Sequence, residues 1–81
     1  MSTLLYLKES IANYADENKL GQRIYNKLKE KAYHNEEEFL ENLSEKEMDY
    51  LDDVLRMEMR YARSAQDSIR EKQLNEIYQL I

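Results

Sequence analysis

The apolar residues in the second half of the chain recur at every third or fourth position. They are Met48, Leu51, Val54, Leu55, Met59, Ala62, Ala65 and Ile69. At 100° per residue these positions fall within an arc of about 140°, which corresponds to one buried stripe on an α-helix. Because no glycine or proline follows Gly21, nothing in the sequence ends the helix locally, and the pattern predicts one long helix over residues 45–79.

The start of this long helix is marked by Ser44-Glu45-Lys46-Glu47. This is a capping box, in which the Ser44 hydroxyl accepts a hydrogen bond from the Glu47 N–H, and the Glu47 carboxylate accepts one from the Ser44 N–H. At 1.5 Å per residue the predicted helix is roughly 50 Å long, which is more than a compact domain of this size needs. The length implies either a kink or a partner that covers the far end.

The first half of the chain carries two apolar stripes that differ in phase. Leu4, Leu7, Ile11, Tyr14 and Ala15 share one helical face, and Leu20, Ile24, Leu28 and Ala32 share a second one. In a continuous helix the second stripe would be rotated by more than about 90° from the first. The phase change predicts helices over residues 3–17 and 21–33, with Ser2 or Thr3 as the first N-cap. The residues before Gly21 form either a true corner or a bend.

A further helix start follows at Asn35, which precedes three consecutive glutamates. An asparagine N-cap with acidic residues in the first turn is typical of a helix N-terminus. That helix is short, over residues 36–43, because Ser44 opens the next one, and Phe39 is expected to fill the corner between them. We therefore predict an all-α fold, in which a single domain forms a small antiparallel helical bundle built on one long C-terminal helix.

The composition supports the all-α prediction and narrows the class of protein. The 81 residues include no proline, one glycine, no cysteine and 36% charged residues, which is typical of a helical domain without disulfides or thiolate metal sites. The net charge of −5 disfavours a general affinity for nucleic acid or anionic membranes. No apolar run is long enough to span a bilayer and no export signal is recognisable, so we expect a soluble, cytoplasmic protein.

Candidate catalytic and metal-binding groups are scarce in this sequence. His34 is the only histidine, whereas zinc and di-iron sites need more than one nitrogen ligand or paired Glu-x-x-His motifs. A single glycine and a single histidine also argue against a phosphate-binding loop and a Ser-His-Asp triad. We therefore predict no enzymatic activity, no catalytic residues, no cofactor and no metal site, and we interpret His34 as a polar residue at a helix end.

The stretch RMEMRYAR contains the only concentration of basic residues, Arg56, Arg60 and Arg63, with Tyr61 nearby. Arginine beside an aromatic ring can contact phosphate and stack on a base. Acidic residues on the same side, Asp49, Asp53 and Asp67, oppose that role, and the four-residue spacings Asp52–Arg56 and Arg63–Asp67 predict ordinary ion pairs. DNA contact through the three arginines is therefore the alternative hypothesis, and nucleic acid is not the expected partner.

The aromatic residues and the apolar C-terminus point instead to protein contacts. Seven tyrosines are spread through the chain, and tyrosine is common both at half-buried core edges and at protein interfaces. An apolar C-terminus is also more typical of a docked end than of a free one, and such an end packs either within the chain or against a second copy. The expected interface residues, toward a second copy or another protein, are Tyr61, Ile69, Leu74, Ile77, Tyr78, Leu80 and Ile81.

The stretches RIYNKLKEKAYHNEEEFLENLSEKEMDYLDDVL and EMRYARSAQDSIREKQLNEIYQLI resemble a small protein family of endospore-forming bacteria, the sigma-G-dependent sporulation-specific acid-soluble spore protein. The similarity covers nearly the whole chain, and its most specific segments are residues 35–39, 61–62 and 74–78. The resemblance implies synthesis in the forespore, residence in the spore interior, and neither enzymatic activity nor catalytic or ligand residues. The DNA-coating spore proteins share the acid-soluble label, but their glycine-containing signatures and protease site are absent here.

These expectations combine into one leading hypothesis and two alternatives. The leading one is a non-enzymatic, small, acidic, helical spore protein made in the forespore, which acts through protein contacts and self-association. The first alternative is a DNA-associated spore protein that contacts phosphates through the three arginines. The second is a regulator that sequesters another protein by offering an amphipathic helix.

Overall fold

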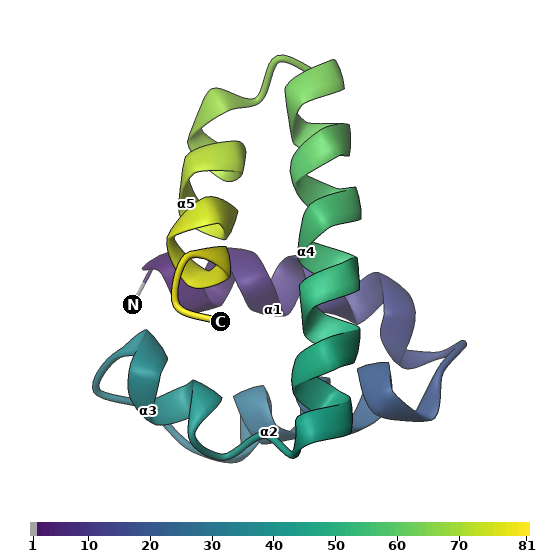
Figure 1. Cartoon of the computed structure of the whole chain (residues 1–81), viewed down its shortest axis with the longest axis vertical. Helices are drawn as coiled ribbons and strands as arrows, with labels where there is room; N and C mark the ends of the chain where they lie inside the picture. Colours follow the sequence, from purple (N-terminus) through teal and green to yellow (C-terminus); the bar gives the residue numbers. More distant parts are fainter. Residues whose placement is uncertain (1) are drawn as a thin grey trace.

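A computed structural model describes residues 2–81, and its regular elements are five helices. They are α1 (Ser2–Ala15), α2 (Lys19–Glu30), α3 (Glu36–Leu40), α4 (Glu45–Ser64) and α5 (Ser68–Tyr78). No strand occurs within the described range, so the all-α prediction is confirmed. Figure 1 shows α4 and α5 side by side as an antiparallel pair, with α1 crossing behind them and the short α3 near the chain ends.

The predicted helix over residues 45–79 is wrong, because the chain turns back between Ser64 and Ser68. The Asp67 N–H donates to the Ala62 carbonyl over 2.8 Å and the Gln66 N–H donates to the Arg63 carbonyl over 3.0 Å. This bonding pattern, with Gln66 at φ 57°, is the Schellman motif that ends many helices. The longest helix is therefore α4, in the middle of the fold, and not a C-terminal one.

Folding back is favoured because α5 has a start signal and an apolar face of its own. The Asp67 carboxylate accepts a hydrogen bond from the Arg70 N–H over 3.1 Å, which makes Asp67 the N-cap. The face turned toward the other helices carries Leu74 and Ile77, both fully buried. The apolar stripe of the preceding helix consequently ends at Ala62, and Ala65 and Ile69 are exposed.

Gln66→Gly is expected to raise the free energy of unfolding by about 1 kcal/mol. A side chain at positive φ costs roughly 1–2 kcal/mol, and glycine removes that cost while adding some freedom to the unfolded chain. Urea denaturation followed by circular dichroism measures the change. The control is Ser64→Gly, at the last helical residue of α4, which should lower stability because glycine is a poor helix former. A Gln66→Gly protein no more stable than wild type would contradict the turn described here.

The junction between α1 and α2 is a true corner. The Asn18 side chain caps α2 by accepting from the N–H groups of Leu20 at 2.8 Å and Gly21 at 3.3 Å, so α2 begins at Lys19 and not at residue 21. Gly21 lies so close to α1 that a Cβ atom there would be 2.7 Å from the Tyr14 carbonyl oxygen. The only glycine of the chain therefore permits this close approach.

Polar contacts tie the N-terminal helix to α5. Thr3 lies within α1, so it is not the N-cap predicted for it; its hydroxyl is hydrogen-bonded to Glu76 over 3.0 Å and also contacts Gln73. The alternative cap at Ser2 concerns a side chain outside the described part of the chain. Arg70 of α5 donates to the fully buried Ser10 hydroxyl over 3.2 Å. These contacts satisfy hydroxyl groups that burial would otherwise leave unpaired.

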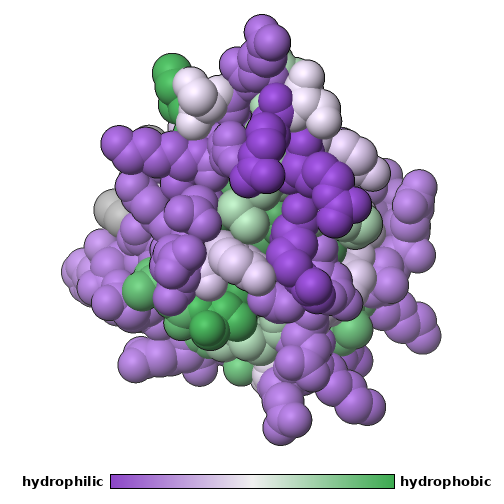
Figure 2. Space-filling model, turned by 45° about the horizontal axis from the view of Figure 1, so that its top comes forward, coloured by the Kyte–Doolittle hydropathy of each residue, from purple (hydrophilic) through white to green (hydrophobic). Residues whose placement is uncertain are grey.

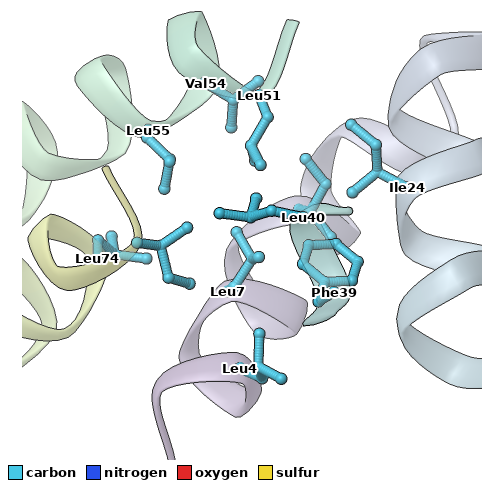
Figure 3. Close-up of a cluster of buried hydrophobic side chains, with 11 residues drawn as sticks. Leu4, Leu7, Ile24, Phe39, Leu40, Leu51, Val54, Leu55 and Leu74 are labelled. Carbon is cyan, nitrogen blue, oxygen red and sulfur yellow. The ribbon is translucent and has the colours of Figure 1, made fainter. Parts of the chain in front are cut away.

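The hydrophobic core forms where all five helices meet. Its residues are Leu4, Leu7, Ile11, Ile24, Phe39, Leu40, Leu51, Val54, Leu55, Leu74 and Ile77. Figure 3 shows the labelled side chains of the different helices pointing toward a common centre. Phe39 is fully buried, and its ring meets Tyr33 edge-to-face with the ring centroids 5.3 Å apart. The short α3 thus serves mainly to place Phe39 and Leu40 in this centre.

The two predicted caps in the middle of the chain are confirmed. Ser44 and Glu47 form both hydrogen bonds of the capping box, at 3.2 and 2.8 Å. Asn35 accepts from the Glu38 N–H over 2.8 Å. The helix that Asn35 starts ends at Leu40 rather than at residue 43, because the residues before Ser44 form a turn.

Candidate functional site

The three arginines proposed for DNA contact differ in how free their charges are. Arg56 forms the predicted ion pair with Asp52, at 3.2 Å, and also contacts Asp53. The Arg63 guanidinium lies 2.6 Å from the Glu71 carboxylate. Arg60 is exposed, and it takes part in no ion pair or side-chain hydrogen bond found within residues 2–81. Two of the three positive charges are therefore neutralised by acids of the same chain.

The predicted ion pair between Arg63 and Asp67 is wrong. It assumed a continuous helix, whereas the turn at Gln66 takes Asp67 off the helical face that carries Arg63. The Asp67 carboxylate instead lies 3.4 Å from Arg70 on its own helix. Arg63 reaches across the helix pair to Glu71 and Arg70 donates to Ser10 of α1, so both arginines hold the turned-back helix in place.

An aromatic and apolar surface lies on the flank of α4, beside the residues of this helix that are buried in the core, and its Tyr50 is itself half-buried against the core. We call it the α4 outer face and define it by Tyr50, Asp53, Met57, Arg60 and Tyr61. The spacing of its three large side chains along the helix places them within an arc of about 40°. Met57 is 37% exposed and Tyr61 is 60% exposed. Apart from Tyr61, these residues line a shallow depression of about 450 Å³, with Val54 as its floor.

One edge of the α4 outer face is fixed by Tyr14 of α1. Its hydroxyl donates to the Glu58 carboxylate over 2.8 Å. Burial, this hydrogen bond and the charge of Glu58 raise the pKa of Tyr14, with further contributions from Tyr50 and Tyr61. The hydroxyl therefore stays protonated and remains a donor to Glu58, which links the edge of the face to α1.

Glu47 and Lys27 form a second polar cluster, whose role is structural. Glu47 is 3% exposed, and its carboxylate lies 2.7 Å from the Lys27 ammonium. Burial alone would raise the pKa of Glu47, but the hydrogen bonds from Lys27 and Ser44 and the charge of Lys27 outweigh it, and this pKa is lowered. The ion pair joins α2, which carries Lys27, to the start of α4, which carries Glu47. Lys27 also donates to the Asn42 carbonyl in the turn before α4.

Glu47→Gln is expected to lower the free energy of unfolding by about 1 kcal/mol at neutral pH, because the bond to Lys27 loses its charge and Lys27 is partly solvated. A carboxylate whose folded pKa lies below its ordinary value of 4.5 stabilises fully above that pH, and its contribution is lost as the pH falls through the folded pKa. Wild type should therefore lose stability faster than the variant below about pH 4.5 in urea titrations. Glu45→Gln, at an exposed position of the same turn, is the control; identical acid slopes for wild type and Glu47→Gln would contradict this role.

The predicted interface residues separate into buried and exposed groups. Leu74 and Ile77 are fully buried in the chain's own core, and Tyr78 is half-buried against it. The remaining four stay exposed by 60, 63, 44 and 41%: Tyr61, Ile69, Leu80 and Ile81. The turn before α5 explains the difference, because it folds one side of the C-terminal segment onto the core.

Two exposed apolar residues were not among the sites predicted from the sequence. Met57 lies between Tyr50 and Tyr61 at helical spacing, and this spacing was the available signal. Leu5 is 55% exposed on α1, where it lines a groove of about 480 Å³ with Leu28, Lys31 and other residues of α1 and α2.

The described part of the chain offers neither a metal site nor a membrane-spanning helix. No group of three or more histidine and carboxylate side chains is arranged to hold a metal ion there. His34 is exposed, and its backbone N–H is directed at the Glu38 carboxylate over 3.4 Å. No helix within residues 2–81 combines the length and the apolar character that crossing a bilayer requires.

Comparison with known proteins places these features in a family context. The model of a family described as minor curli fiber component A matches residues 1–81. The chain is also 48% identical over 79 residues to the sigma-G-dependent sporulation-specific SASP protein of Bacillus subtilis strain 168, an alignment that covers 98% of this chain and 95% of that relative. No solved structure matches the chain.

Proposed function

We propose, on the premise that this chain belongs to the family described as minor curli fiber component A and to that of the sigma-G-dependent sporulation-specific SASP protein, that it is a non-enzymatic protein of the developing spore. The resemblance noted in its sequence is thereby confirmed. The proposed protein is made in the forespore and stays in the spore interior, as the name of the relative suggests. It acts through protein contacts, and its first partner is a second copy of itself.

The observation that carries this proposal is the set of large apolar side chains left exposed on a strongly charged protein. Figure 2, which brings the α4–α5 turn forward, shows hydrophilic side chains over most of the visible face and hydrophobic groups in small patches between them. The α4 outer face places Met57 beside two tyrosines, and methionine and tyrosine are enriched at protein interfaces. Burial of these side chains between two copies would supply the driving force for association.

The description of the matching family supports association but says nothing of its geometry. It refers to a component of a fibre, which is an assembly of many subunits. The described residues of this chain are helical, with no strand among them. We therefore propose association between folded, helical copies, in which the side chains on helix surfaces form the contact.

DNA contact is the less favoured function for this chain. Arg56 and Arg63 already pair with carboxylates, which leaves Arg60 as the free charge among the three, and the net charge of −5 repels phosphate. A fluorescence anisotropy titration with duplex DNA should show no binding at low salt. Tight binding that weakens with added salt and disappears when all three arginines are replaced by alanine would favour DNA contact instead.

Sedimentation equilibrium tests the proposed self-association directly. We expect the weight-average mass to rise above the monomer mass of 9.8 kDa as the concentration increases from about 10 to 500 µM, the range in which modest interfaces associate. A mass that remains at the monomer value over the whole range would overturn the proposal.

A further inference from the structure

We propose that two copies pair through their α4 outer faces in antiparallel orientation, with the two-fold axis passing between Leu55 and Arg56. In this register Tyr50 of one copy faces the partner's Tyr61, and Val54 faces the partner's Met57. The proposal rests on the self-association inferred above, for which it names the surface and the arrangement of the partner.

The spacing of the apolar residues fits a pair of helices better than an isolated surface. Tyr50, Val54, Met57 and Tyr61 are separated by four, three and four positions, which is the spacing of the contact residues in a coiled coil. Reversing one copy about the proposed axis superimposes this set on itself, so each large side chain meets an apolar position of the partner. Such self-complementarity is what a two-fold symmetric interface requires.

The surface is open in the folded chain. Tyr61 is 60% and Met57 is 37% exposed, whereas Val54 is 1% exposed and forms the floor on which the partner's Met57 would rest. Figure 1 shows α5 along one side of the upper half of α4, while no helix of the described chain covers the opposite side. The hydrogen bond between Tyr14 and Glu58 holds the neighbouring edge in place. The face is therefore accessible and preorganised.

The order of charges along the face selects the antiparallel arrangement. Asp49 and Asp53 precede the two-fold axis and Arg60 follows it. In the antiparallel register Arg60 lies opposite position 51 of the partner, within two residues of both aspartates. In a parallel two-fold pair the flanks that carry Arg60 and the aspartates lie on opposite sides of the contact, so Arg60 does not meet the partner's Asp49 or Asp53. The antiparallel arrangement brings these flanks together and gives the unpaired Arg60 a carboxylate partner.

The contact area is modest, so the pairing should be weak and reversible. A single helix face with three large side chains falls in the lower class of interface sizes, below about 1,200 Å² in total, which is typical of transient complexes. Its dissociation constant should therefore be about 1 µM or higher, and a value of about 1 µM corresponds to a binding free energy of about −8 kcal/mol. The geometry of the complex, rather than its strength, is the discriminating observation.

Thiol cross-linking in the full chain tests the register, since the chain contains no cysteine. Lys46→Cys and Ser64→Cys introduce single thiols at exposed positions near the two ends of the face, where they leave its apolar residues intact. When the two variants are mixed under mild oxidation, the antiparallel register predicts mainly the mixed disulfide, which mass spectrometry identifies. Ile69→Cys, exposed but away from the face, is the control and should cross-link weakly with either. A statistical mixture, or a preference for the two homodimers, would overturn the antiparallel register.

Charge exchange supplies an independent test. Arg60→Asp and Asp53→Arg should each raise the dissociation constant about fivefold or more, because each places like charges in contact. The double variant restores opposite charges across the interface, so its dissociation constant should return to within about twofold of wild type. Additive losses in the double variant would contradict the pairing. A wild type that stays monomeric would overturn the self-association itself, whereas association unaffected by these substitutions would overturn only the assignment to α4.

Discussion

Phe39→Ala is expected to lower the free energy of unfolding by about 3–5 kcal/mol, the usual cost of removing a fully buried aromatic ring. The ring is completely enclosed and packs edge-to-face on Tyr33. Because α3 has only five residues, it contributes little besides Phe39 and Leu40 to the centre of the fold. A domain of this size holds only a few kcal/mol of net stability, so the variant should be largely unfolded at 37 °C, as measured by thermal denaturation.

The matched control for this prediction is Phe39→Leu. Leucine keeps most of the buried volume, and we expect it to cost less than half as much as alanine, or roughly 1.5 kcal/mol. A loss below about 1 kcal/mol for Phe39→Ala would mean that the site collapses without a cavity. In that case the short α3 would not hold the position in the core that is described here.

Gly21→Ala is expected to destabilise the protein by about 1–3 kcal/mol, although alanine is the better helix former by roughly 1 kcal/mol. The added Cβ atom would lie 2.7 Å from the Tyr14 carbonyl oxygen and 3.0 Å from the Tyr14 carbonyl carbon. Both atoms belong to the backbone, so α1 and α2 must move apart to accommodate the methyl group. Urea denaturation at neutral pH measures the loss.

The neighbouring residue gives the control for the corner. Gln22→Ala, at an exposed position of the same helix, changes helix propensity without adding an atom against α1. Its effect on the free energy of unfolding should stay within about 0.5 kcal/mol. A Gly21→Ala protein that is more stable than wild type would show that propensity dominates. The corner between α1 and α2 would then be less tightly packed than the distances indicate.

Local signals in the sequence were sufficient for the starts of α3 and α4. Ser44 with Glu47, and Asn35 with Glu38, place polar side chains at spacings that satisfy backbone N–H groups, and these short-range hydrogen bonds form as expected. The same is true of the stripe from Leu51 to Ala62, because its residues share one side of a single helix. The correct predictions, of these two caps and of this stripe, thus depend on interactions between residues about four positions apart or fewer.

The end of α4 could not be predicted from the usual C-terminal capping residue. Helices of this kind commonly end on glycine or asparagine at the position with positive φ, whereas here Gln66 occupies it. The remaining cue was the set of capping residues Ser64, Asp67 and Ser68, which the apparent continuity of the apolar stripe obscured. The hydrogen bond from Arg70 to Ser10, which joins residues 60 positions apart, depends on the tertiary fold and leaves no local pattern.

The error at Gln66 also shaped the predicted site. Leu74 and Ile77 were predicted as interface residues of a docked C-terminal end, and the turn buries both in the chain's own core. The arginines of the RMEMRYAR stretch were identified from the sequence. The contacts of Arg56 with Asp53 and of Arg63 with Glu71 were not predicted, because they depend on how the side chains are placed in the fold. Tyr61 belongs to both the predicted and the observed surface, and its neighbour Met57 completes the α4 outer face.

The central claim is that copies of this protein associate through the α4 outer face. The most direct measurement is sedimentation equilibrium of wild type beside Met57→Glu and a control, Leu5→Glu, which adds the same charge at an exposed apolar residue elsewhere. We expect wild type and Leu5→Glu to exceed the monomer mass of 9.8 kDa at about 500 µM, whereas Met57→Glu should remain at it. A monomeric wild type, or a Met57→Glu variant that associates like wild type, would contradict the claim.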